Sequence, residues 1–336
     1  MHGQVLSRAV ESQVEDRARP SVTVALTPMG PMVDVYDHVV PGTPPIACTS
    51  YVTRGFRDLG HDEIVFTLRT DHRPERVFVL HPVDLLRLLH WRIQGGERLQ
   101  PGALVGPPLT RAIDWPPITG FAFERALPIA GLDLPRRTLA MLALFGPEHD
   151  VAHAFGPARV LSRLAVAAGR FPAPAWCDLD RAPVAAAGEV SRLGRTHALR
   201  LPAVTVTCEA GGLHLRVARS VRPALARSLD GLPAPFALLA TLDRRADARL
   251  VWVPGQERPR RFAPPGSRGA AVGGAFVAFV EGHREDAIGL AEDGFVVALT
   301  DAAASSLRTA IRIGASLELP AAAGRSFRLA WTADPD

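Results

Sequence analysis

The chain has 336 residues, of which 47% are hydrophobic, enough to bury one large core or two smaller ones. Its formal net charge is only +4, and its cationic residues are all arginine, because lysine is absent, as is asparagine. Arginine has a higher pKa than lysine, so the basic pI of 9.6 reflects arginine usage and does not indicate nucleic-acid binding. Lysine and asparagine both use AA-rich codons, and their absence indicates a GC-rich, bacterial genome.

Three cysteines, Cys48, Cys177 and Cys208, lie far apart in the sequence and form no CxxC pair. This sparse, odd-numbered set argues against a disulfide framework and a zinc ribbon, and predicts free buried thiols in a reducing compartment. The N-terminal residues lack the apolar segment of a secretory signal. The longest apolar runs, such as 139–145, are much shorter than the roughly 20 residues that a membrane span needs. We therefore expect a cytoplasmic protein with no membrane span.

Strand signals recur along most of the chain. After a polar arm over 1–20, runs rich in β-branched and aromatic residues predict strands over 21–27, 46–53, 63–69, 118–126, 139–146, 203–209, 213–219, 236–243, 250–253, 271–280, 294–300 and 326–332. Gly55 and Gly60 suit turn positions with positive φ, and 244–248 is expected to form a hairpin turn. Because strands often follow one another directly, we predict an α+β fold of two mixed or antiparallel sheet halves with flanking helices.

Four predicted helices share one pattern of boundaries, with Pro or Asp at the start and Gly just past the end. They start at Pro82, Pro157, Pro223 and Asp301, and they stop before Gly95, Gly169, Gly231 and Gly314. Apolar residues at helical spacing are expected to face the core at Leu85, Leu86, Leu89, Ile93, Val160, Leu161, Leu164, Ala168, Leu307, Ala310 and Ile311. Arg159 and Arg163 are expected to face solvent, and Asp301 is expected to cap the last helix.

Two long segments, 95–117 and 171–200, show no clear periodicity. Long loops in compact domains tend to be functional or disordered, and the second one is a natural boundary between two halves. We therefore predict an N-terminal arm over 1–20, an N-terminal α+β half over 21–180, a linker over 181–200 and a C-terminal α+β half over 201–336.

The segment His149-Asp150-Val151-Ala152-His153 is the feature most typical of an enzyme. Residues four apart share one face of a helix, so two imidazoles could bind one zinc ion, as in the HExxH motif. However, Asp would reach a metal-bound water less well than Glu, and no third ligand has diagnostic spacing. We predict no metal site, and a metal-dependent hydrolase using His149 and His153 is kept as an alternative.

Other catalytic patterns are weak or missing. Asp178 and Asp180 form a DxD pair that could hold Mg²⁺, but no phosphate-cradling glycine pattern precedes it. A phosphate-binding loop, a dinucleotide fingerprint and a serine-nucleophile elbow are all absent from the sequence. We therefore predict no cofactor, no catalytic residue and no enzyme activity. The basic run 258–261 could contact an acidic partner or phosphate, although such runs more often form solvated hairpin loops.

Three aromatic residues, Trp115, Phe171 and Trp176, lie in the two Pro-rich segments. A large ring beside rigid proline makes a good anchor for a partner, because little conformational entropy is lost on binding. The same rings could instead fill the edge of the core. We predict these residues as the binding surface for an unknown protein partner, with no nucleic-acid partner.

Two groups of residues resemble a known family. The first group resembles, in residue types and spacing, the opening of the C-terminal domain of SARA (Smad anchor for receptor activation) and endofin. It consists of Thr53, Gly55, Leu59, Gly60, Glu63, Ile64 and Val65. The second group resembles the far end of that domain. It consists of Val272, Gly273, Phe276, Phe279, Glu292, Asp293, Gly294, Val297, Thr300, Ser306, Leu307, Arg308, Ala310, Arg312 and Trp331. The strands and turn from Tyr51 to Leu68 also resemble, more faintly, the suppressor-of-fused module.

The resemblance implies a stand-alone, non-catalytic interaction domain of the scaffold or adaptor type. A phosphoinositide-binding FYVE finger requires many more cysteines than the three present, so none is expected. Suppressor-of-fused-like proteins of bacteria are thought to include immunity proteins that neutralise toxins, which gives a second alternative by analogy of fold. From the residues themselves, we expect Glu63 to accept backbone N–H bonds from the turn before it, and 292–294 to form a tight turn.

Overall fold

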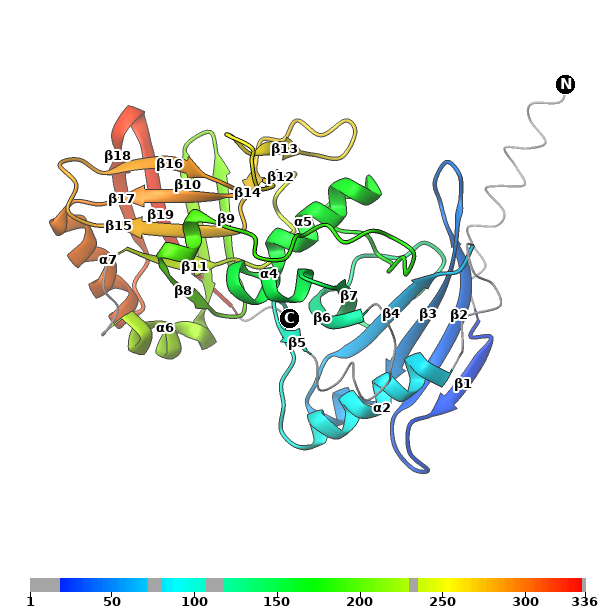
Figure 1. Ribbon diagram of the computed structural model, residues 1–336. Coiled ribbons are helices and arrows are strands. Elements are labelled where there is room, and N and C mark those ends of the chain that lie inside the picture. The colour runs from blue at the N-terminus through cyan, green and yellow to red at the C-terminus, as the bar shows by residue number, and fades with distance from the viewer. Residues whose placement is uncertain (1–18, 72–79, 107–117, 230–234, 334–336) are drawn as a thin grey trace, which may run out of the picture. The chain divides into compact units, whose positions relative to one another are not determined.

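The computed structural model describes residues 19–71, 80–106, 118–229 and 235–333. The chain separates into two compact units: unit 1 comprises 1–99, 105–143 and 175–182, and unit 2 comprises 100–104, 144–174 and 183–336. Helices and mixed sheets occur together, which confirms the α+β class (Figure 1). The expected halves were continuous in sequence, whereas the observed units interleave. The expected arm over 1–20 lies almost wholly outside the described residues.

Unit 1 is built on a seven-stranded mixed sheet in the order β1-β2-β3-β4-β7-β6-β5. The strands are β1 (Val22–Ala25), β2 (Met32–Val40), β3 (Ile46–Arg54), β4 (Glu63–Arg69), β5 (Leu104–Val105), β6 (Ile118–Arg125) and β7 (Thr138–Phe145). Strands β1 to β4 form antiparallel neighbours, and β4 runs parallel to β7. Helix α2 (Leu80–Gln94) packs against β3 and buries the predicted stripe of Leu85, Leu86, Leu89 and Ile93.

The turn between β3 and β4 is organised by the buried carboxylate of Glu63. Its oxygens accept the backbone N–H of Gly55 at 3.0 Å and that of Arg57 at 3.3 Å, and the Thr53 hydroxyl donates to it at 2.7 Å. Gly55 and Gly60 have φ values of 105° and 69°, a region that glycine enters at little cost. The predicted roles of Glu63 and of both glycines are confirmed, and these roles are structural.

Unit 2 contains two sheets. Their orders are β13-β12-β14-β9-β10-β19-β18 and β16-β17-β15-β11-β8. The strands are β8 (His197–Arg200), β9 (Val204–Glu209), β10 (Gly212–Ala218), β11 (Phe236–Leu239), β12 (Ala248–Val251), β13 (Arg260–Phe262), β14 (Val272–Gly273), β15 (Phe276–Val280), β16 (Ala287–Ala291), β17 (Gly294–Ala298), β18 (Leu317–Ala321) and β19 (Arg325–Thr332). Since β8 pairs with β11, the expected linker over 181–200 contributes a strand to this unit.

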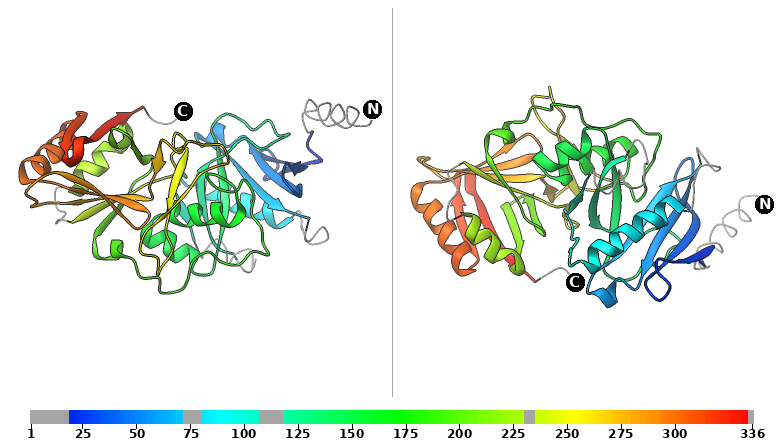
Figure 2. Two further views of the ribbon diagram at one scale, coloured as in Figure 1. Left: turned by 90° about the horizontal axis from the view of Figure 1, so that it is seen from above. Right: turned by 60° about the horizontal axis from the view of Figure 1, so that its bottom comes forward.

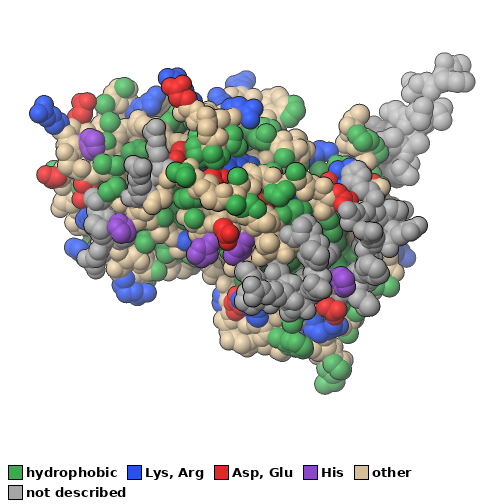
Figure 3. Space-filling view, viewed as in Figure 1, with side chains coloured by type: hydrophobic (Ala, Val, Ile, Leu, Met, Phe, Trp, Pro, Cys, Tyr) green, Lys and Arg blue, Asp and Glu red, His purple; other side chains and the backbone are tan. Residues whose placement is uncertain are grey.

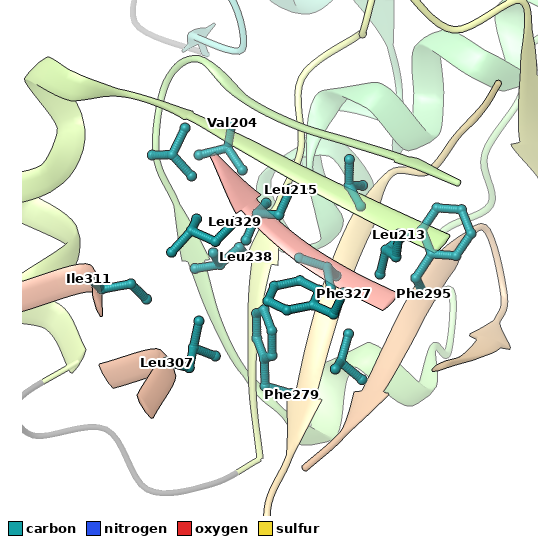
Figure 4. Packing of buried hydrophobic residues seen from close by; sticks show 14 of the residues in the cluster. Val204, Leu213, Leu215, Leu238, Phe279, Phe295, Leu307, Ile311, Phe327 and Leu329 are labelled. Atoms are coloured by element: carbon teal, nitrogen blue, oxygen red, sulfur yellow. The ribbon is translucent and has the colours of Figure 1, made fainter. Parts of the chain in front are cut away.

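The core of unit 2 lies between its two sheets. Val204, Leu215 and Phe327 from one sheet pack with Leu238, Phe279 and Phe295 from the other, as Figure 4 shows. The rings of Phe279 and Phe327 meet edge to face, with their centroids 5.6 Å apart. Helices α6 (Arg222–Leu229) and α7 (Asp301–Ile313) lie side by side (Figure 2), and α7 adds the predicted Leu307, Ala310 and Ile311 to this core.

Helices α4 (Glu148–Phe155) and α5 (Pro157–Ala168) follow β7, and 3-10 turns occur at 57–59, 192–195, 219–221 and 322–324. Gly169 and Gly314 end α5 and α7 in the left-handed conformation, as predicted. Three expectations were wrong. The hydroxyl of Thr300, one residue before Asp301, caps α7; 244–248 links strands of different sheets; and 271–280 divides into β14 and β15, which also belong to different sheets.

Candidate functional site

The two histidines of the proposed metal motif lie on α4, one turn apart. Their ring centroids are 6.3 Å apart, so they do share a face as the spacing predicted. Asp150, in the position of the catalytic base, is exposed and lies 3.6 Å from His149 Nδ1. No group of three or more His, Cys, Asp or Glu side chains in the described part of the chain is arranged to hold a metal ion. Within the described residues, no third ligand therefore joins His149 and His153.

The three aromatic residues predicted to bind a partner have different surroundings. Trp115 lies outside the described residues. Trp176 belongs to unit 1 and is only 6% exposed, so its ring offers little surface to a partner. Phe171 belongs to unit 2, is half-buried and packs its ring against that of Phe262, with centroids 6.2 Å apart. Trp176 and Phe171, the two that the structure describes, are thus each at least partly buried within their own unit.

The DxD pair has a structural explanation. Asp178 accepts a hydrogen bond from Arg69 Nη1 at 3.1 Å and another from the backbone N–H of Asp180 at 2.9 Å. Both carboxylate oxygens of Asp178 are thus engaged within unit 1. This pair stabilises the segment that follows Cys177, which itself bonds to β4 through backbone contacts with Thr67 and Arg69.

A buried polar network, which we call the arginine cluster, lies inside unit 2 and consists of Arg159, Arg163, Arg249, Glu189, Glu292 and Asp293. Arg159 on α5 is fully buried. Its guanidinium donates to both oxygens of Asp293, at 3.0 and 2.6 Å, and to Glu292 at 2.6 Å. Its Cζ also lies 5.4 Å from the centre of the Trp252 ring. The expectation that Arg159 faces solvent was wrong.

The other two arginines connect α5 with its surroundings. Arg163, also expected in solvent, donates to both oxygens of Glu189 at 2.6 and 2.7 Å, and its Nε donates to the backbone carbonyl of Trp252 at 2.8 Å. Arg249 on β12 donates to the hydroxyl of Ser162 on α5 at 3.0 Å. An unpaired charge in the interior would cost several kcal/mol, so the pairing with Glu189 explains how Arg163 can be buried.

In the arginine cluster, opposite charges offset the effect of burial on the pKa of each group. Burial alone would lower the pKa of Arg159, but Asp293 and Glu292 outweigh this effect and raise the pKa above its usual value. Burial raises the pKa of Asp293, and Arg159 offsets part of that rise. The Arg159 guanidinium therefore stays protonated, and each partner would be costly to bury without the other.

A pocket of about 1000 Å³ opens on unit 2 beside this cluster, and we call it the β16 pocket. One wall is the edge strand β16 with the Glu292 turn, and the other is the hairpin that leads from Trp252 through Arg258 to Arg261. Cys208, Leu250 and Val272 of the larger sheet also line it. Leu290 on β16 is 61% exposed, although most large apolar side chains of this unit are buried. The pocket thus combines apolar surface with charged side chains.

The arginine cluster connects the two walls of the β16 pocket. Arg159 holds the Glu292 turn at the end of β16 and stacks near the Trp252 ring, while Arg163 holds the Trp252 backbone. Ser191 also donates to Glu292, at 2.6 Å. Because both walls are fixed to the same helix by charge-assisted hydrogen bonds, the shape of the pocket is set by the folded core. Such a preformed, partly apolar pocket is a typical binding site.

The β16 pocket differs in charge from the face of the molecule shown in Figure 3. On the face shown in Figure 3, acidic and basic side chains of the described residues are interspersed and form no broad patch of one sign. The β16 pocket, in contrast, is lined by Arg258, Arg261 and Arg325, all exposed, against Glu257 and the paired Glu292. In the basic run 258–261, Arg258 and Pro259 lie in the loop of the β12–β13 hairpin, and Arg260 and Arg261 lie on β13. No local pattern in the sequence indicates that this hairpin forms one wall of a pocket.

The fold and the site together define a two-unit α+β protein with a preformed pocket on one unit. No described helix has both the length and the apolar character needed to cross a membrane. No protein-family model matches the chain, and no curated protein matches it.

Among solved structures, the chain is similar to Drosophila Suppressor of Fused, with 11% identity and a TM-score of 0.35, over 90% of this chain and 88% of that one. It is also similar to a chain in the Sufu–Fu complex, with 15% identity and a TM-score of 0.37, over 54% of this chain and 91% of that one. Both belong to the family that 51–68 faintly resembles. At these TM-scores neither likeness carries an argument about fold or function, and the resemblance to SARA and endofin stays a prediction.

Proposed function

We propose that the chain is a non-catalytic protein-binding module that acts in the cytoplasm, and that the β16 pocket is its contact surface. The observation that supports this is the pocket itself: exposed Leu290 lies on a sheet edge beside a half-apolar cavity whose walls are fixed by buried ion pairs. Exposed apolar surface rimmed by polar residues is typical of protein interaction sites. It is a second candidate beside the surface predicted around Trp115, Phe171 and Trp176, which stays a prediction.

The residues that line the pocket favour binding over catalysis. The only cysteine in its lining, Cys208, has a pKa raised by burial, which leaves its thiol protonated and a poor nucleophile. The exposed arginines can attract a ligand of opposite charge. A binding role uses these side chains without requiring any of them to react.

Site-specific cross-linking tests this proposal. A photo-reactive amino acid at Leu290 should cross-link one protein in native cells, whereas the same residue at Ile313, which is 66% exposed in the same unit, should not. The captured protein is then purified and titrated against Leu290→Arg and Ile313→Arg. We expect Leu290→Arg to weaken binding at least about tenfold, as for a central contact, and Ile313→Arg to leave it unchanged. The proposal fails if both positions capture the same proteins or if Leu290→Arg binds normally.

A further inference from the structure

The edge strand β16 has a free row of backbone hydrogen-bonding groups. Among the described strands it lies at the end of its sheet and pairs on one side only, with β17. The register places Ala291 opposite Gly294 across a two-residue turn, so Ala287, Gly289 and Ala291 are expected to bond to β17. The N–H and C=O groups of Ile288 and Leu290 then point away from the sheet. Another extended chain is the ligand whose spacing matches such a row.

Nothing in the sequence of β16 protects this edge from pairing. Unused edges usually carry a charge or a proline that blocks a further strand. The other edge strands of unit 2 do so: β13 has Arg260 and Arg261, β18 has Glu318 and Pro320, and β8 has His197 and Arg200. Strand β16, with the sequence AIGLA, has neither. Among the described edges of this unit, it is the one left open to another strand.

The position of Leu290 indicates toward which face of the sheet the side chains of an added strand would point. Leu290 pairs with the buried Phe295, so both side chains lie on the core-facing side of the sheet. Leu290 is nevertheless 61% exposed, because at this edge the β16 pocket separates it from the facing sheet. A strand added beside β16 would direct every second side chain into this pocket, where Leu250 and Val272 offer apolar contact.

The charged residues around the opening of the β16 pocket indicate which charge a ligand should carry. Arg258 and Arg325 form no ion pair within the described residues, and Arg261 donates to the backbone carbonyls of Arg268 and Gly269. Of the two lining carboxylates, Glu292 is already bound by Arg159, which leaves Glu257 alone against three arginines. Electrostatic complementarity therefore favours an acidic ligand.

From these observations we propose that the partner presents an acidic, extended segment that adds to β16 as a further strand and inserts alternate apolar side chains into the β16 pocket. The segment should run over about five residues, the length of β16. This inference rests on the proposed protein-binding function, and it adds the conformation and charge of the bound segment.

The test uses two synthetic nine-residue peptides, one alternating valine with glutamate and its twin alternating valine with lysine. We expect the acidic peptide to bind more tightly and to slow hydrogen exchange at the amides of Ile288 and Leu290. Methylating alternate backbone nitrogens of the acidic peptide, on the side that would face β16, should abolish binding because pairing is lost. The proposal is overturned if the lysine twin binds as well, or if those two amides remain unprotected.

Protein variants separate the backbone and charge contributions. Leu290→Pro removes an outward N–H without removing a bond to β17, and Leu290→Ala retains that N–H while removing the same side chain. The proline variant should lose binding much more than the alanine variant, with circular dichroism and thermal melting confirming the fold of both. Reversing charge at Arg258 and Arg325 to Glu should weaken the acidic peptide by about tenfold and favour the lysine twin. Equal binding by all variants would contradict the inference.

The cross-linking experiment distinguishes this inference from the function on which it rests. If Leu290 captures a partner through a segment that is helical or not acidic, the inference fails and the protein-binding function stands. If Leu290 captures no specific protein, the proposed function itself fails.

Discussion

Replacing Arg159 by leucine should strongly destabilise unit 2. The side chain is fully buried and makes four hydrogen bonds to carboxylates, at 3.1, 3.0 and 2.6 Å to Asp293 and 2.6 Å to Glu292. Leucine would leave two buried carboxylates without that partner. Breaking one side of a buried ion pair costs about 3–5 kcal/mol, and for a domain of this size this lowers the melting temperature by roughly 6–20 °C.

The measurement is urea denaturation of the full chain, with Arg328→Leu as the matched control. Arg328 pairs with Glu318 at 2.8 Å in the same unit, but both side chains are about half exposed, so its loss should cost about 0–1 kcal/mol. Because burial already raises the pKa of Asp293, losing Arg159 should raise it further, and the destabilisation should shrink as the pH falls and the carboxyl becomes protonated. Arg159→Leu costing no more than Arg328→Leu would refute the reasoning.

Three further predictions concern single side chains. His61 is buried, and burial is the main cause that lowers its pKa. Its Nδ1 forms a hydrogen bond with the Asp62 carbonyl, and its Nε2 accepts one from the Leu99 N–H. Unfolding free energy should therefore fall as the pH drops below the unfolded value of about 6.5, by at most about 1.4 kcal/mol per pH unit for this group. His61→Leu should flatten this slope in urea titrations, and an unchanged slope would count against it. Glu63→Ala should cost about 1–3 kcal/mol in the same assay, because it leaves the N–H groups of the β3–β4 turn without an acceptor; a loss below about 0.5 kcal/mol would contradict this. Among the three free thiols, a maleimide should label half-buried Cys208 first in the native protein, because Cys48 and Cys177 are buried. Burial also raises the pKa of Cys48 to about 12. Mass spectrometry after brief labelling tests this order, and earlier labelling of Cys48 would disprove it.

Local signals predicted a large part of the secondary structure. Strand β4 has the predicted boundaries 63–69, because an apolar, β-branched run is bounded by the glycine turn before it. Helices α5 and α7 end at Gly169 and Gly314, since these glycines adopt the left-handed conformation that a helix end requires. These features depend on neighbours within a few residues, and such neighbours are visible in the sequence.

Two strands, β16 and β2, were missed for a physical reason. Strand β16 consists of five small or aliphatic residues, one of them glycine, so it shows no alternation of polar and apolar residues. Strand β2 was missed as well, because its charged Asp34 and Asp37 weaken the apolar pattern. Pairing with β17 and with β3 makes both segments strands, and pairing is a property of the sheet.

The sequence by itself determined the α+β class, the main helices and the turn held by Glu63, because each of these follows from composition, periodicity or contacts between near neighbours. Only the tertiary structure decided the site. Arg159 occupies a helix position that normally faces solvent, and it is buried because Glu292 and Asp293, more than 130 residues away in the chain, meet it with opposite charge. The same long-range pairing sets the two walls of the β16 pocket, since no local pattern records which distant carboxylate will neutralise a given arginine.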